Sequence, residues 1–270
     1  MLQGVVYIAT GRQYVDEALK SAASLKAMSP SIHVTAFSDE QVNSSHIDNT
    51  VVINGTPHCE RQRASDASDS TRIQAVGQSK GMLNKVRYIG RSPYERTLFL
   101  DSDTYVADDI TDLFSLLDRF DIAVAHAPHR SPRGAAERRR FQEIPQGFVV
   151  MNTGVILFKK SEGTAAFFSE WLRLCQEEYL DCNDQASFRV ALYHSDLRIA
   201  TLTPEYNYRF RKRLCINGSL KILHGRHPHL PIVAKQAEAL VAAGIAGPLV
   251  ASQRSHLVRL FLSVRKIFCH

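Results

Sequence analysis

Short apolar runs alternate with helical periodicity from the first residues of the chain. Gly4 to Ala9 is an apolar, β-branched run that predicts a strand. Apolar residues then recur at helical spacing until Pro30, and Ile32 to Phe37 returns to a strand pattern. Strand, helix and strand in this order predict a βαβ unit, and therefore a mainly parallel sheet covered by helices.

The run from Arg96 to Val106, RTLFLDSDTYV, predicts a buried strand that ends in an Asp-Ser-Asp triplet. In open α/β sheets, ligands bind at the carboxyl ends of the strands. Carboxylates two residues apart on extended backbone point to the same side, so Asp101 and Asp103 are candidates to bind one hard cation. The alternative is that both acids only cap backbone amides at a strand-to-helix turn.

A second apolar run, from Phe148 to Phe158, is interrupted by Asn152-Thr153-Gly154. Polar groups inside a buried strand cost stability unless they are satisfied, and a glycine there often marks the close approach of a ligand. Asn152 is therefore a candidate site residue. The remaining pattern predicts strands at 51–53, 121–127, 199–202 and 221–223, and helices at 71–91, from Asp109 to about Leu117, at 164–178 and at 184–193.

Composition is that of an ordinary globular protein, with 270 residues, 44% hydrophobic residues and 22% charged residues. The five cysteines are scattered, and none forms a Cys-x-x-Cys pair, so we expect reduced thiols in a cytoplasmic protein. The N-terminal segment predicts a first strand rather than a signal peptide. No run of eighteen apolar residues occurs, so no membrane span is expected. We expect one domain over residues 1–250, followed by a basic tail at 251–270.

The net charge of +6 is concentrated in two places. As a helix, the tail would carry an apolar stripe flanked by basic residues, a pattern that suits peripheral contact with a membrane. The alternative is a terminal helix packed on the core. A second cluster, between Arg130 and Arg140, is interpreted as a solvated loop or a lid. Basic and aromatic residues do not interleave as they do in nucleic-acid-binding proteins, so we expect no nucleic-acid partner.

Taken in order, LFLDSDT, NTGVILF, NDQ, PEYNYR and ILHGR resemble the GT-A glycosyltransferases, most closely their glycogenin and lipopolysaccharide galactosyltransferase-like branch, family 8-like. The resemblance covers about Gly4 to Arg226. It implies a single Rossmann-like α/β domain with a mostly parallel mixed sheet. It also implies an enzyme that moves a sugar from a nucleotide diphosphate sugar, expected to be a UDP-sugar, to a glycan or glycolipid acceptor with retention of configuration.

The resemblance also implies roles for individual residues. Asp101, Asp103 and His224 would bind Mn²⁺, or Mg²⁺ as the alternative. Asn152, Asp184 and Gln185 would contact the transferred sugar. The residues that would contact the donor are Thr10, Gly11, Arg12, Tyr14, Asp39, Ser102 and Arg226, together with either Lys80 or Lys85.

The chain departs from the family pattern in two places. After His224, the sequence GRHPHLP replaces the family's x-x-Gly-x-x-Lys-Pro-Trp, so the lysine that would bind the diphosphate is missing. Arg226 is a candidate replacement, because a guanidinium binds phosphate through two hydrogen bonds. The turn Thr10-Gly11-Arg12 lacks the family's acidic residue, which leaves the choice of nucleotide open.

Two other functions fit parts of the pattern. Asp-x-Asp-x-Thr after an apolar strand is also the nucleophile motif of haloacid-dehalogenase phosphatases, in which Asp101 would be the nucleophile and Asp103 the acid/base. That motif normally opens its fold, whereas about a hundred residues precede it here, and no Gly-Asp-x-x-x-Asp motif follows. The other alternative is a non-catalytic protein that binds an anionic surface or a nucleotide.

Overall fold

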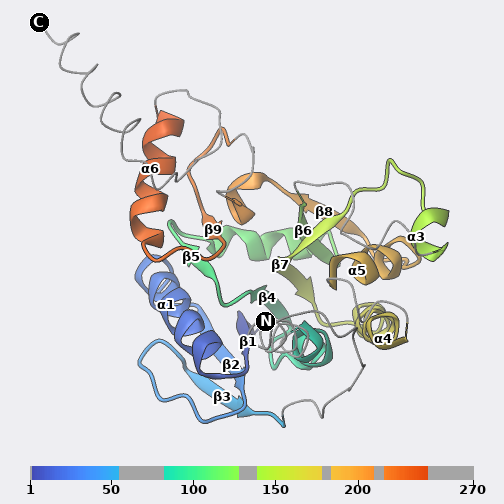
Figure 1. The fold of residues 1–270 in the computed structure, drawn as a ribbon, viewed down its shortest axis with the longest axis horizontal. Helices are drawn as coiled ribbons and strands as arrows, with labels where there is room; N and C mark the ends of the chain where they lie inside the picture. Colours follow the sequence, from blue (N-terminus) through green and yellow to red (C-terminus); the bar gives the residue numbers. More distant parts are fainter. Residues whose placement is uncertain (1, 55–81, 128–138, 178–183, 210–215, 243–270) are drawn as a thin grey trace, which may run out of the picture.

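A seven-stranded sheet forms the centre of the molecule (Figure 1). The computed structural model describes residues 2–54, 82–127, 139–177, 184–209 and 216–242. Across the sheet, the strands are β3 (Asn49–Val52), β2 (His33–Ser38), β1 (Gln3–Ala9), β4 (Arg96–Leu100), β7 (Met151–Lys159), β6 (Ile122–His126) and β8 (Ile199–Leu202). Of these strands only β7 runs opposite to its neighbours. The mostly parallel mixed sheet predicted from the sequence is confirmed.

Helices cover both faces of this sheet (Figure 1). The helix α1 (Arg12–Met28) and the 3₁₀ helix Thr111–Asp118 share one apolar core with alternate residues of the strands. The helices α4 (Glu162–Glu177) and α5 (Asp184–Tyr193) share the other core. Successive strand residues point to opposite faces, so Leu98 packs in the first core and Phe99 in the second. Both faces are therefore buried, as expected of a parallel sheet.

A small second sheet extends from the carboxyl edge of the first. The strand β5 (Thr104–Val106) pairs in antiparallel fashion with β9 (Ile222–His224), and Thr104 lies opposite His224. The helix α6 (Leu230–Ala242) packs with these strands in a third, smaller core. Neither β5 nor α6 is predicted by the sequence pattern, because β5 has only three residues and its partner is far away in the sequence.

Most of the other elements match their predictions to within a few residues. One differs in type, since the segment predicted as a helix after Asp109 is a 3₁₀ helix, where Asp109 accepts a hydrogen bond from the Thr111 N–H at 3.2 Å. A further short helix is α3 (Arg139–Glu143). Residues 251–270, Lys80 and the part of the basic cluster from Arg130 to Arg138 lie outside the described residues. Within the described ranges, no helix has the length and apolar character needed to cross a bilayer.

Asp121, just before β6, connects the ends of β7 and β8 at the far edge of the sheet through charged hydrogen bonds. Its carboxylate accepts the Arg198 N–H at 2.8 Å and lies 2.8 Å from the Lys159 Nζ. Hydrogen bonds from Arg198, together with Lys159, hold the pKa of Asp121 well below its usual range. The stability that this pairing contributes is therefore full above about pH 4, where the unfolded carboxyl is ionised, and declines at lower pH.

We expect Asp121→Asn to lower the free energy of unfolding by about 1 kcal/mol at pH 7, because the pairing is partly exposed to solvent. The difference from the unmodified protein should shrink at pH 3, where the unfolded carboxyl is largely protonated. Urea unfolding at the two pH values measures both differences. An equal loss at both would show that the charge of Asp121 is not the cause.

Candidate active site

The Asp-Ser-Asp triplet lies where the two sheets meet. Beyond the last residue of β4, the Asp101 N–H still donates to the Gly154 carbonyl oxygen of β7 at 2.8 Å. The chain then turns into β5, and the Asp103 carbonyl oxygen accepts the Gly225 N–H at 2.9 Å. Backbone hydrogen bonds to different sheets therefore fix the positions of both aspartates.

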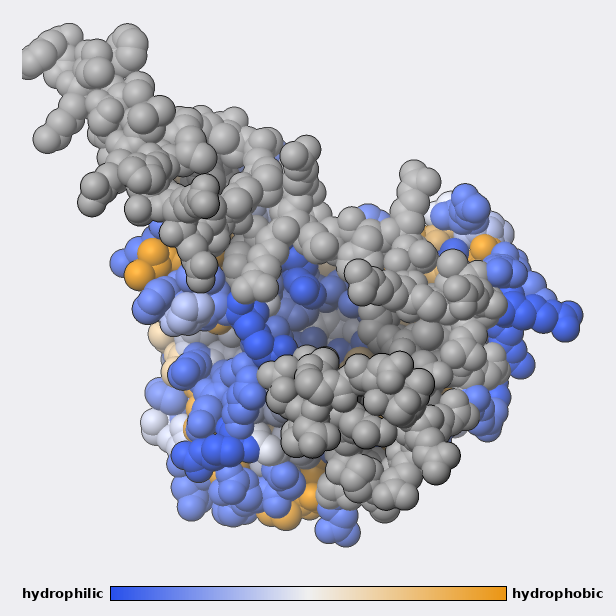
Figure 2. Space-filling model, in the orientation of Figure 1, coloured by the Kyte–Doolittle hydropathy of each residue, from blue (hydrophilic) through white to orange (hydrophobic). Residues whose placement is uncertain are grey.

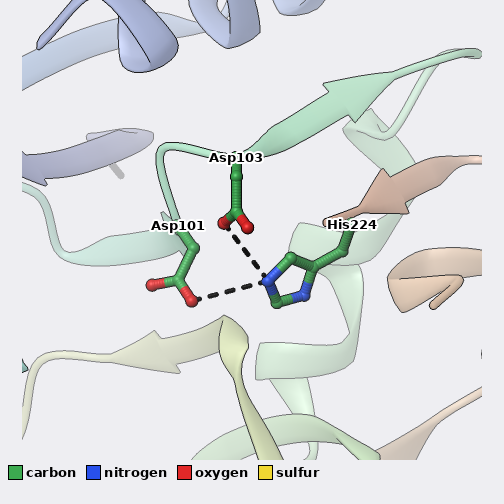
Figure 3. Close-up of side chains that lie close together, drawn as sticks. All are labelled: Asp101, Asp103 and His224. Carbon is green, nitrogen blue, oxygen red and sulfur yellow. Dashed lines mark ion pairs between the residues drawn. The ribbon is translucent and has the colours of Figure 1, made fainter. Parts of the chain in front are cut away.

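His224, the last residue of β9, points at these two carboxylates (Figure 3). Its Nε2 lies 3.4 Å from an oxygen of Asp103 and 3.6 Å from an oxygen of Asp101. Ligand atoms from all three residues lie within 4.8 Å of one another. Neighbouring ligands of an octahedral cation with bonds of about 2.1 Å lie about 3 Å apart, so this donor set suits a divalent cation after a small adjustment. Among the described residues, it is the only such cluster.

Gly154 makes room for the imidazole. A Cβ atom at this position would lie 1.9 Å from the Cε1 of His224, far closer than atoms can approach. In the sequence, this glycine was interpreted as a mark of close approach by a ligand. The group that approaches the backbone is the ring of His224, which no local pattern could reveal because β9 is distant in the sequence.

Lys85 connects Asp101 to the start of α5. Its Nζ lies 3.1 Å from an Asp101 oxygen and 2.8 Å from an Asp184 oxygen, and it donates to the Thr153 Oγ1 at 3.2 Å. Thr153 in turn donates to Asp184 at 2.8 Å. Burial lowers the pKa of Lys85, but the charges of Asp101 and Asp184 outweigh that effect and the pKa lies above its ordinary value. Lys85 is therefore a positively charged group inside the site at neutral pH.

The two aspartates have opposite electrostatic surroundings. Burial raises the pKa of Asp101 above its usual value, although Lys85 and His224 act to lower it. For Asp103, the effect of burial is outweighed by the neighbouring His224 and by the charge of Arg226, so its pKa lies well below the usual range. A cation placed between the two carboxylates would stabilise the ionised form of both.

A cavity of about 450 Å³ opens over these groups, a volume typical of small-molecule sites. Hydrophilic residues gather where this face of the molecule is hollowed (Figure 2). Its lining contains the three candidate metal ligands and six other predicted residues, namely Thr10, Tyr14, Lys85, Ser102, Asp184 and Arg226. Ile8, Met82 and Arg209 also line it, and the sequence analysis did not select them.

The remaining predicted residues lie beside or behind the cavity. The side chain of Arg12 is 79% exposed and pairs with Asp16 and Glu40, while the carboxylate of Asp39 accepts the Gly11 N–H at 3.0 Å. None of these groups is part of the lining. Gln185 follows Asp184 on α5, and its buried Oε1 has no hydrogen-bond partner among the described residues.

Asn152 lies behind His224 and is almost completely buried. Its Oδ1 accepts hydrogen bonds from the Gly154 N–H at 3.1 Å and from Asn207 at 2.9 Å. Its Nδ2 finds no partner within the described part of the chain. Asn152 is not among the residues that line the cavity.

Glu17 is a site residue that the sequence analysis missed. From α1, its carboxylate accepts hydrogen bonds from Arg226 at 2.8 Å and from the Ser102 hydroxyl at 3.1 Å. The guanidinium of Arg226 also lies 5.3 Å from the ring centre of Tyr14. A signal was available, because Glu17 is three residues after Tyr14 and therefore shares its face of the helix. Asn207 and Arg209 lie inside the PEYNYR motif, which was noted without selecting them.

Comparisons with known proteins indicate the class of enzyme. Residues 94–224, which run from the start of β4 to His224, match the family model described as nucleotide-diphospho-sugar transferase. This match indicates a glycosyltransferase, and the fold is that of the GT-A glycosyltransferases. The predicted resemblance to the glycogenin and lipopolysaccharide galactosyltransferase branch is thereby confirmed, and the match favours a transferase over the phosphatase alternative.

Solved glycosyltransferases share the fold over most of this chain. The galactosyltransferase LgtC, in complex with donor and acceptor sugar analogues, is 15% identical with a TM-score of 0.55, and the match covers 89% of this chain and 95% of LgtC. Mouse xyloside xylosyltransferase 1 is 15% identical with a TM-score of 0.53, and the match covers 83% of this chain and 97% of the mouse protein. GlyE of Streptococcus pneumoniae is also 15% identical with a TM-score of 0.53, and the match covers 93% of this chain and 66% of GlyE. Among curated protein sequences, none is significantly similar to this chain.

Lys85 and Asp184 are buried together, so removing one charge leaves the other uncompensated. We expect Lys85→Met to lower the free energy of unfolding by about 3 kcal/mol. The double variant Lys85→Met/Asp184→Asn should lose less free energy of unfolding than the two single variants added together. The second change removes the buried charge that Lys85→Met leaves without a partner. Equilibrium unfolding of the four proteins measures this coupling. Simple additivity would contradict the ion pairs described here.

Proposed function

We propose that this glycosyltransferase moves a sugar from a UDP-sugar to a glycan or lipid-linked acceptor, with a divalent metal ion and with retention of configuration. The observation that carries the proposal is the convergence of Asp101, Asp103 and His224 in a cavity that also contains cationic side chains. A nucleotide diphosphate sugar carries two negative charges on its diphosphate. A site for it needs fixed positive charge on the protein and a place for a cation.

Asp101, Asp103 and His224 would hold Mn²⁺, with Mg²⁺ as the alternative. When bound, the metal would neutralise charge on the diphosphate and on the departing nucleoside diphosphate as a Lewis acid. The two carboxylates and the imidazole suit Mn²⁺, which accepts oxygen and nitrogen ligands.

Arg226 would bind the diphosphate in place of the lysine that this chain lacks. Its position supports this role, because it lines the cavity and its charge acts on Asp103. Glu17 holds the guanidinium by two hydrogen bonds, at 2.8 Å and 3.2 Å, which fixes its direction before a ligand arrives. A guanidinium can bind phosphate oxygens through two parallel hydrogen bonds.

Thr10 and Tyr14 would border the nucleoside, because both line the cavity at the carboxyl end of β1. Gly11, Arg12 and Asp39 would lie at its rim. The Gly11 N–H donates to Asp39, and Gly11 adopts a φ of 87°, which places this turn in the conformation that favours glycine. Ser102 would contact the donor beside the metal ligands.

Asp184 and Gln185 would contact the hydroxyls of the transferred sugar. The partnerless Oε1 of Gln185 supports its role, because buried polar groups without partners are rare in folded proteins. Asn152, predicted to contact the same sugar, is buried behind His224 and would act on the site through Asn207 and His224. Lys85 would hold the Asp184 carboxylate in place through their ion pair. Of the two lysines predicted near the donor, it is the one that lines the cavity.

Retention would follow from substitution on one face of the sugar. The bond from the anomeric carbon to the phosphate oxygen breaks while the acceptor oxygen bonds from the same side. The leaving phosphate oxygen takes the proton of the acceptor hydroxyl. Asp184 and Gln185 would orient the sugar during this exchange.

Metal-dependent donor binding is tested by thermal shift. We expect UDP-galactose or UDP-glucose at 100 times its Kd to stabilise the protein by about 2.7 kcal/mol, seen as a rise in Tm, when Mn²⁺ is present. Asp103→Asn should abolish the part of the rise that requires Mn²⁺. Asp196→Asn, the same change at an exposed position, should keep it. An equal rise without Mn²⁺ would contradict metal dependence.

Stereochemistry is tested by the slow hydrolysis of the α-linked donor. Proton NMR of the first sugar released should show the α anomer before mutarotation, because retention places water on the face that the leaving group vacates. Release of the β anomer would contradict retention without affecting the assignment of the donor.

A further inference from the structure

Three buried polar side chains form a chain of hydrogen bonds behind the candidate metal site. Asn152, Asn207 and His224 are 1%, 3% and 4% exposed. The His224 Nδ1 lies 2.7 Å from the Asn207 Oδ1, and the Asn207 Nδ2 lies 2.9 Å from the Asn152 Oδ1. Neither asparagine lines the cavity, so both act from behind the imidazole.

The backbone N–H of Gly154 fixes the direction of this chain. It lies 3.1 Å from Asn152, and because an N–H can only donate, the asparagine atom it meets is an oxygen. Asn207 meets the same oxygen and must therefore donate to it through its Nδ2. The other amide atom of Asn207, its Oδ1, then faces the imidazole as an acceptor. The Nδ1 of His224 is consequently the nitrogen that carries the proton.

We propose that Asn207, aligned by Asn152, is a positioning residue that holds His224 in the tautomer protonated at Nδ1. This inference rests on the proposed metal-dependent function, since it leaves the lone pair of Nε2 directed between Asp101 and Asp103. A metal ligand needs that lone pair, and an orienting hydrogen bond at the other ring nitrogen is a general feature of metal-binding histidines.

The surrounding acids would otherwise select the opposite tautomer. Carboxylates accept hydrogen bonds, and the Nε2 lies 3.4 Å from Asp103 and 3.6 Å from Asp101. Without the Asn207 acceptor, a proton on Nδ1 of a neutral imidazole would have no acceptor among the described residues. A proton on Nε2 would have two, the carboxylates of Asp101 and Asp103. The proton on Nε2 would then occupy the position that a cation needs.

The elements that carry this chain are tied together by backbone hydrogen bonds. The His224 N–H donates to the Tyr208 carbonyl oxygen at 2.9 Å, and the Tyr208 N–H donates to that of Ile222 at 2.8 Å. The 3₁₀ helix Pro204–Asn207, which delivers Asn207, is therefore fixed beside β9. Gly154 contributes twice, since its N–H sets the direction of the chain and its missing side chain admits the ring.

The test compares the intact chain with three variants. Asn207→Leu removes the acceptor with little change in volume. Asn207→Asp keeps an oxygen acceptor for the Nδ1 proton. Asn217→Leu makes the same change as the first variant at an exposed position ten residues away. Long-range ¹H–¹⁵N NMR of histidine-labelled protein, free of metal at pH 8, reports which ring nitrogen carries the proton.

We expect a proton on Nδ1 and an unprotonated Nε2 in the intact chain and in Asn217→Leu. In Asn207→Asp we expect the proton on Nδ1 to be retained. Asn207→Leu should place the proton on Nε2. A proton on Nε2 in the intact chain would overturn the proposal. So would an unchanged tautomer in Asn207→Leu, or a loss of the Nδ1 proton in Asn207→Asp equal to that in Asn207→Leu.

Mn²⁺ binding, measured by electron paramagnetic resonance with the metal alone, gives a second readout. We expect Asn207→Leu to weaken Mn²⁺ binding 10- to 100-fold and Asn217→Leu to leave it unchanged. Equal affinity in Asn207→Leu and the intact chain would overturn the positioning role. Failure of the intact chain to bind Mn²⁺, with its Nδ1 proton in place, would contradict the proposed function and support the tautomer assignment. Circular dichroism of each variant shows whether a loss comes from unfolding.

Discussion

Repulsion between neighbouring carboxylates is the constraint on which the site depends. Asp101 and Asp103 both face His224, and Asp184 approaches the same centre from α5. Lys85 offsets part of this negative charge because its Nζ contacts both Asp101 and Asp184. The charge of Arg226 acts on Asp103 from the other side. The proposed divalent cation would balance the negative charge that remains.

The topology of the sheet brings these groups together. The strand β7 runs antiparallel to β4, so its first residues lie beside the last residue of β4, and Gly154 meets Asp101 there. The pairing of β6 with β7 shifts register between Val124 and Ala125, which is a bulge of the kind often found beside active sites. The small sheet of β5 and β9 then carries His224 back over the triplet.

The sequence predicted the sheet well because its strands are short apolar runs between turn residues. It predicted Asp101, Asp103 and His224 as a set only through the family resemblance, since nothing local links residues so far apart in the sequence. Arg12 shows the limit of this approach, because it follows β1 but its side chain pairs with Asp16 and Glu40. Side-chain direction depends on neighbours that the sequence does not show.

The residues missed by the sequence analysis share one property. Glu17 and Asn207 act through hydrogen bonds to Arg226 and His224, and such partners are defined by the folded structure alone. Gly154 was noticed, but its role became clear only when the ring of His224 was found against its backbone. Supporting residues of a site therefore lie beyond what motif spacing can predict.

The central claim is that Asp101, Asp103 and His224 bind the metal ion that accompanies the nucleotide sugar. Its most direct test is anomalous diffraction from crystals grown with Mn²⁺ and UDP. The account predicts one manganese peak in contact with all three side chains and with the diphosphate of UDP. A manganese ion bound elsewhere, or UDP in this cavity without manganese at these residues, would contradict it.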